Sequence, residues 1–215
     1  MPPRTPLSRA RIVAAATRVA DEGGLAAVSM RSVARALGAE AMSLYHHVSG
    51  KEELLDLLAD VAFEQIPLLE IGTPWRPAMT SRAHAMRAVL KKHPWALTLL
   101  ESRSHPGPAV LRHHDRVLGI LRQDGFGLAL AAHAYSVLDA YIYGFVLTEL
   151  SLPFTPETGP EPFADGLALS AADHPHLAEM LQQMVLGEDY AFGNEFGYGL
   201  DLVLDQLELR RAGQP

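Results

Sequence analysis

The chain has 215 residues, 48% hydrophobic and 20% charged, so it is long enough to bury a core in one or two domains and is neither disordered nor fibrous. It contains no cysteine, which excludes disulfides, thiolate metal sites and a cysteine nucleophile. Residues 1–51 carry seven basic and three acidic side chains, a net +4, whereas residues 52–215 carry eleven basic and twenty-two acidic ones, a net −11. This asymmetry indicates an anionic partner for the front end, although a chance fluctuation in surface charge would give the same pattern.

Apolar residues recur at helical spacing along the whole chain, without the alternation typical of strands. A first helix is expected to begin at a Ser8 cap and to stop near the glycines at 23–24. Ser29 is expected to cap a short second helix, which Gly38 ends in the left-handed conformation. A third short helix follows at about residues 40–48. Two short helices joined by a tight glycine-containing turn predict a helix-turn-helix.

A long helix is expected over residues 51–66, because its acidic first turn suits the positive end of the helix dipole. The later helices are expected at about residues 78–92, 94–103, 108–123, 127–150, 174–186 and 189–210. The stretch 151–175 contains seven glycines and prolines, which predict a long loop or a mobile segment. The sequence therefore predicts an all-α protein.

The string VSMRSVARALGAEAMSLYHHVSGKEELLDLLAD at residues 28–60 has a polar helix start, a Leu-Gly turn, Leu-Tyr-x-His, and a lysine before an acidic and apolar helix. In this order and spacing, these elements resemble the DNA-binding domain of the TetR (tetracycline-repressor) family. The later sequences HPW, DGF and FGxxFGYGLDLVLDQLE resemble, more loosely, the tetracycline-repressor type of C-terminal domain. The resemblance implies an all-α homodimer with a helix-turn-helix DNA-binding domain at residues 1–50, a connecting helix at 51–70, and a larger effector-binding and dimerisation domain at 71–215.

The resemblance also implies which residues contact DNA. Arg31 matches a base-reading arginine, whose paired donors suit guanine, while Tyr45, His47 and Lys51 match phosphate-contacting positions. By helical geometry, the outward residues of the third helix are Glu40, Ala41, Ser43, Tyr45 and His46. The alternatives are that Tyr45 packs against the first helix and that His46 is only solvated. Ala41 and Met42 differ from the larger polar and proline residues of the tetracycline repressor, so we expect a different operator.

An effector pocket is expected on the helices between residues 78 and 150, whose apolar faces carry scattered polar groups. The positions that match the family's pocket are Arg82, Met86, Glu101, His105, His114, Val117, Leu118, Tyr135 and Asp139. A carboxylate such as Asp139 in an apolar helix must be paired or neutralised, either by a protein group or by the ligand. Tetracycline is not expected as the inducer, because Glu101 stands where the tetracycline repressor has a metal-binding histidine.

The last helix is expected to form a four-helix dimer interface together with residues 127–150 and their mates. The apolar stripe that predicts it consists of Phe192, Phe196, Leu200, Val203 and Leu207. The alternative is that this stripe packs only within its own subunit. Neither the pair His113 and His114 nor the pair His174 and His176 has the i, i+4 spacing of a helical metal site, so we expect no metal and no cofactor.

The leading hypothesis is a homodimeric, ligand-responsive repressor that binds a palindromic operator in double-stranded DNA and is released by an unidentified small-molecule effector. No signal peptide is evident, so we expect a cytoplasmic protein and no membrane association. Two alternatives stay open. One is a helical enzyme with Asp139 or Glu101 as base, for which no complete catalytic set can be assembled. The other is a membrane-binding or protein-binding helical module built on residues 128–147, where buried ionisable groups would be costly.

Overall fold

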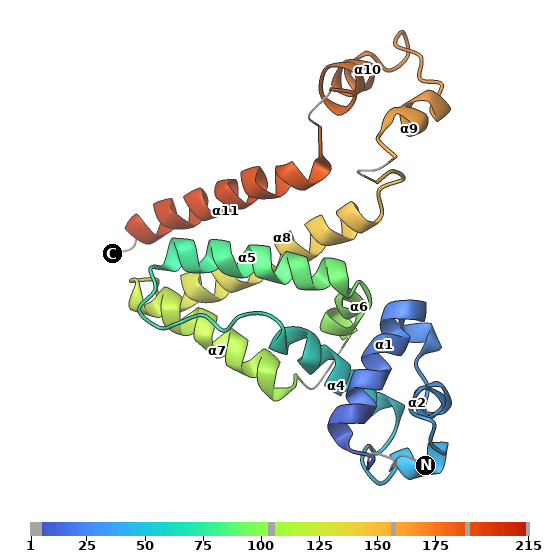
Figure 1. The fold of residues 1–215 in the computed structure, drawn as a ribbon. Helices are drawn as coiled ribbons and strands as arrows, with labels where there is room; N and C mark the ends of the chain where they lie inside the picture. Colours follow the sequence, from blue (N-terminus) through green and yellow to red (C-terminus); the bar gives the residue numbers. More distant parts are fainter. Residues whose placement is uncertain (1–5, 103–105, 156–157, 188–189, 214–215) are drawn as a thin grey trace. The chain divides into compact units, whose positions relative to one another are not determined.

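The computed structural model describes residues 6–102, 106–155, 158–187 and 190–213 (Figure 1). Every regular element within these ranges is helical, which confirms the predicted all-α fold. The chain forms two compact units, Met1–Tyr143 and Gly144–Pro215. These units are defined by contacts within the chain and do not test the functional domain boundaries that we expected near residues 50 and 70, which stay a prediction.

The helices of the first unit are α1 (Arg9–Ala27), α2 (Met30–Leu37), α3 (Ala41–Leu44), α4 (Lys51–Glu64), α5 (Trp75–Lys92), α6 (Trp95–Ser102), α7 (Pro108–Gln123) and most of α8 (Leu128–Leu150). The second unit contains the end of α8, α9 (Glu161–Gly166), α10 (Pro175–Met180), a π-helical turn (Leu181–Val185), a 3-10 turn (Phe192–Asn194) and α11 (Glu195–Ala212).

Local capping fixes the boundaries of α2. The hydroxyl of Ser29 accepts a hydrogen bond from the Ser32 backbone N–H at 3.0 Å, and the Ser32 hydroxyl accepts from the Ser29 N–H at 2.9 Å, which forms a reciprocal capping box. Gly38 ends α2 with a φ of 63°, as expected. Gly24 also has a positive φ, 67°, but it only kinks α1, which continues to Ala27. The predicted stop of the first helix is therefore a kink.

The first four helices share a small apolar core. Ile12, Val33, Leu44 and Leu54 each have 0% of their surface exposed, and burial of such a side chain is worth about 1.5–3 kcal/mol. From this core, α4 extends to pack against α6 and α7 as well as α1 (Figure 1). It is therefore the element that joins the helix-turn-helix to the remaining helices of the first unit.

Several helices depart from the sequence-based expectation. The third helix, expected at about residues 40–48, is an α-helix only over Ala41–Leu44 and is followed by a turn. The last helix, expected at about residues 189–210, begins at Glu195 after a 3-10 turn. α5 begins at Trp75 rather than near residue 78, because the Trp75 N–H donates to the Asp124 carboxylate at 2.6 Å and its ring packs edge-on against Phe126. The stretch 151–175 contains α9, so the expectation of one long loop is wrong there. α9 has a proline in its first turn, a position where the missing N–H of proline costs nothing.

α8 is long and apolar enough to cross a membrane by length and composition alone, and no other helix in the described ranges meets those criteria. The core helix of a soluble protein meets them equally well. α8 does contribute fully or almost fully buried side chains to the first unit, including Leu138 and Ile142. Packing within the protein therefore accounts for part of its apolar composition, since 39% of the most apolar 18-residue window is buried.

Candidate functional site

The predicted DNA-contacting residues lie on α2, on α3 and the turn after it, and at the start of α4. Five of the eight side chains are exposed, namely Arg31, Glu40, Tyr45, His46 and Lys51, and three are half-buried, namely Ala41, Ser43 and His47. Within the described residues, neither Arg31 nor Lys51 forms an ion pair or a side-chain hydrogen bond. Both cations are therefore free to meet an anion, as a DNA-reading surface requires.

The first turn of α4 is tied to α1. Glu53 forms an ion pair with Arg9 and accepts a hydrogen bond from the Ser49 N–H at 2.6 Å. The hydrogen bonds from Ser49 and the charge of Arg9 lower the pKa of the Glu53 carboxyl. Glu53 thus holds α4 against the DNA-reading part of the chain.

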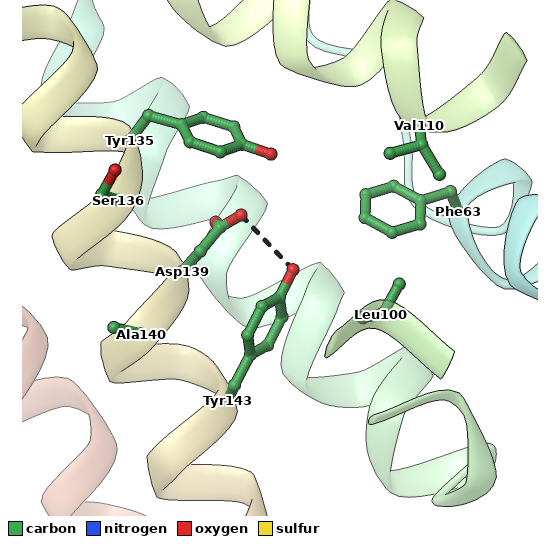
Figure 2. A pocket seen from close by; sticks show the side chains of 8 residues that line it. All are labelled: Phe63, Leu100, Val110, Tyr135, Ser136, Asp139, Ala140 and Tyr143. Atoms are coloured by element: carbon green, nitrogen blue, oxygen red, sulfur yellow. Dashed lines mark hydrogen bonds between the residues drawn. The ribbon is translucent and has the colours of Figure 1, made fainter. Parts of the chain in front are cut away.

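A cavity of about 310 Å³ lies among α4, α6, α7 and α8. Figure 2 shows one wall on α8, where the hydroxyls of Tyr135 and Tyr143 converge near Asp139, and an apolar wall opposite it. The residues that line the cavity are Phe63, Leu100, Val110, Tyr135, Ser136, Asp139, Ala140 and Tyr143. The site is mostly apolar with a few convergent polar groups, which is typical of a small-molecule site.

The polar wall is organised around Asp139, which is 7% exposed. Its Oδ1 accepts a hydrogen bond from Arg82 Nη1 at 2.7 Å, and its Oδ2 accepts from the Tyr143 hydroxyl at 3.3 Å. Burial and the Asp139 charge raise the pKa of both Tyr135 and Tyr143 well above the ordinary value, so both phenols stay protonated donors. Two further nitrogens of Arg82, Nε and Nη2, are buried without a partner among the described residues.

The predicted pocket residues separate into distinct groups. Tyr135 and Asp139 line the cavity, Arg82 pairs with Asp139, and His114 stacks on the Tyr135 ring with centroids 3.8 Å apart. Three others do not line the cavity: Met86 and Val117 are buried in the core at 1% exposure, and Leu118 is half-buried. The side chain of Glu101 and the whole of His105 lie outside the described residues.

Six cavity residues were missed by the sequence reasoning: Phe63, Leu100, Val110, Ser136, Ala140 and Tyr143. Helical spacing could have found those on α8, because they lie on the face that carries Asp139. Phe63 lies on the helix that we regarded as a connector, and no local pattern marks it as a cavity residue.

The predicted dimer stripe on the last helix is largely buried within a single chain. Phe196, Leu200 and Leu207 are 0%, 1% and 4% exposed, and the Phe192 and Phe196 rings pack on Phe145 inside the second unit. Side chains that are already buried can contribute little further area to a partner. Val203 is half-buried, like Phe192. The alternative of packing within the subunit therefore fits most of this stripe, while the exposed apolar side chains of α11 are Tyr198, Leu202 and Leu209.

Two carboxylates connect helices that line or approach the cavity. Asp60 Oδ1, on α4, accepts hydrogen bonds from the Ala109 and Val110 N–H groups at 2.7 and 3.2 Å, and so caps the start of α7. Asp21 Oδ1, on α1, accepts from His93 Nδ1 at 2.6 Å and from Trp95 Nε1 at 2.7 Å. The helix-turn-helix and the cavity helices are thus linked by directional hydrogen bonds.

Comparison with known proteins gives consistent matches over the chain. Residues 12–58 match the family model of bacterial regulatory proteins of the tetR family, and residues 66–211 match the tetracyclin repressor-like C-terminal domain. An HTH-type transcriptional regulator of Saccharopolyspora erythraea is 36% identical, over 80% of this chain and 74% of that protein. The HTH-type transcriptional repressor DrrR1 of Streptomyces coeruleorubidus is 33% identical, over 96% and 79%. The structure of ActR from Streptomyces coelicolor in complex with actinorhodin is 28% identical with a TM-score of 0.79, covering 98% of this chain and all of that one.

Proposed function

Because the chain belongs to the TetR family of transcriptional regulators, which are soluble bacterial proteins and not enzymes, we propose that it is a homodimeric cytoplasmic repressor released from a palindromic operator by a small-molecule effector. Its helix-turn-helix makes it a DNA-binding regulator. The observation that carries the effector proposal is the cavity of about 310 Å³ with the buried polar wall around Asp139.

The same wall argues against the enzymatic alternative. The Asp139 carboxylate is committed to Arg82 and Tyr143, and both tyrosines keep their protons, so none of these groups is poised as a general base. The wall can instead orient a ligand. The Tyr143 and Ser136 hydroxyls already donate within the chain, to Asp139 and to the Ala132 carbonyl, so their oxygens can accept a hydrogen bond from a ligand. The aromatic rings of Phe63, Tyr135 and Tyr143 suit a flat apolar body.

A ligand releases DNA only if it binds more tightly to a conformation in which the two helix-turn-helix domains of the dimer no longer fit adjacent major grooves than to the DNA-binding conformation. α4 supports such coupling, because Phe63 lines the cavity near one end while Glu53 is paired with Arg9 of α1 near the other. Asp60, between them, caps the start of α7 beside the cavity residue Val110. A coupling of about 1–3 kcal/mol would lower DNA affinity roughly 5–150-fold.

We expect a dimer, because one helix-turn-helix would cover only one half-site of the proposed palindromic operator. Two reading heads on a palindrome lie about 34–36 Å apart. The second unit offers exposed apolar side chains for pairing, namely Tyr198, Leu202 and Leu209 of α11 and Leu147 near the end of α8. Leu202→Asp should give monomers in sedimentation, whereas a folded and fully dimeric variant would place the interface elsewhere.

The function is tested by selecting duplexes from a random DNA library with the full chain and measuring binding by fluorescence anisotropy. We expect a palindromic consensus with salt-dependent affinity. Actinorhodin, which the ActR structure holds, is the first effector probe. Ala140→Trp fills the cavity and should abolish the response to a bound probe, while Ala132→Trp, also exposed on α8 but outside the cavity lining, should preserve it. Enrichment of no sequence above background would refute the repressor function.

A further inference from the structure

We propose that Met42 is a specificity-determining residue that contacts the 5-methyl group of a thymine in each operator half-site. α3 then reads the major groove by apolar contact more than by hydrogen bonding. The inference rests on the DNA-binding role of the helix-turn-helix and is independent of the effector cavity.

The exposure of Met42 carries the argument. At 72%, it is the most exposed of the large hydrophobic side chains within the described residues. It lies at the second position of α3, whose fourth residue, Leu44, is fully buried in the core beneath it. A long apolar side chain that projects from the reading helix gains nothing from the fold of its own chain. It gains buried area only when a surface covers it.

The neighbours of Met42 leave α3 with few hydrogen-bond donors. The Ser43 hydroxyl donates to the Glu40 carbonyl oxygen at 2.6 Å, so its proton is used within the helix. Ala41 offers only a methyl group. The exposed carboxylate of Glu40 can only accept hydrogen bonds when ionised. The longest exposed side chain of α3 is therefore that of Met42, which ends in a thioether and offers no hydrogen-bond donor.

The major groove presents one apolar group, the 5-methyl of thymine, and apolar side chains recognise it by contact. Methionine suits this role because it is unbranched, flexible and polarizable, and so adapts to a methyl group at its tip. The burial of one methyl group is worth about 0.8 kcal/mol, which corresponds to about a fourfold change in Kd. The contact therefore adds base preference without dominating the affinity.

Thymine and uracil differ only by this methyl group, which allows a direct test with the selected operator. Each thymine of one half-site is replaced in turn by deoxyuridine, and Kd is measured by anisotropy with the full chain. We expect one position at which deoxyuridine weakens wild-type binding about fourfold. In Met42→Ala that penalty should disappear, whereas Met42→Leu, which keeps an apolar side chain, should keep most of it.

Met184→Ala is the matched control, because Met184 is also an exposed methionine but lies in the second unit. It should retain the full deoxyuridine penalty. A selected operator whose wild-type affinity is unchanged by deoxyuridine at every thymine would overturn the role of Met42 alone. So would a Met42→Ala variant that weakens thymine and deoxyuridine duplexes by the same factor. Selection of no sequence at all would overturn the operator proposal together with this one.

Discussion

The buried ion pair between Arg82 and Asp139 gives the largest stability effect that we expect from a single substitution. Their side chains are 1% and 10% exposed, and Asp139 accepts the one hydrogen bond that the described residues receive from the Arg82 guanidinium. Asp139→Ala would leave a buried cation without an anionic or hydrogen-bonding partner among the described residues, and the Tyr135 ring, with its centroid 5.5 Å from the guanidinium carbon, would still face it. Loss of one member of such a pair costs about 3–5 kcal/mol. For a chain of this length, that loss corresponds to a fall in Tm of about 6–20 °C.

The measurement is urea unfolding followed by circular dichroism, at one fixed protomer concentration because dimerisation contributes to the apparent stability. The matched control replaces both partners, Arg82→Met with Asp139→Leu, which removes both charges while keeping apolar volume. This double variant should be close to wild type or more stable. An Asp139→Ala variant that loses less than about 1 kcal/mol would refute the reasoning. A double variant as unstable as the single one would also refute it, because packing rather than the unpaired charge would then explain the loss.

Three further predictions concern the helix-turn-helix with the start of α4, and the buried His113. Ser29→Ala removes the capping box of α2 and should cost about 1 kcal/mol in urea unfolding. Burial and the nearby charge of Arg82 lower the pKa of His113 in the folded protein. As the pH falls, this histidine is therefore protonated in the unfolded chain before it is protonated in the folded one. Stability should therefore fall as pH drops through about 6.5, and His113→Phe should flatten that fall in melts from about pH 8 to about pH 5. Lys51→Ala should weaken all duplexes alike and reduce the salt slope by about one unit, whereas Arg31→Ala should relax one base position; the reverse pattern would exchange their roles.

The DNA-reading part could be predicted from the sequence because its boundaries are set by local chemistry. Ser29 caps α2 through its own neighbour Ser32, and Gly38 ends the helix through its left-handed backbone. α4 begins at Lys51, as the acidic first turn indicates. Such signals act over three or four residues, so they are visible in a single sequence. The contacts of these residues with DNA remain predictions, because they depend on a partner.

The cavity and the pairing surfaces were harder to predict because they depend on which helices meet. A carboxylate at position 139 demands a partner, but nothing in the sequence shows that this partner is Arg82, 57 residues away. Helical spacing identified Phe196 and Leu200 as an apolar stripe and could not tell a partner subunit from the chain's own core. The position of Phe63 shows the same limit, since a connecting helix and a cavity wall have the same apolar pattern.

The HPW sequence at residues 93–95 gains a role from its contacts with Asp21. The Asp21 carboxylate on α1 accepts hydrogen bonds from His93 and Trp95, and so holds the helix-turn-helix domain against the start of α6. Leu100, on the same helix α6, lines the cavity. α6 is thus, beside α4, a second connection between the cavity and the helix-turn-helix domain. Asp21→Asn keeps the shape but weakens both hydrogen bonds, because the acceptor loses its charge. We expect it to keep DNA affinity without ligand and to reduce the factor by which a bound probe lowers that affinity, within the roughly 5–150-fold range typical of such coupling. If Asp21→Asn changed both affinities by the same factor in anisotropy titrations, the contact would only support the fold, and α4 would carry the signal alone.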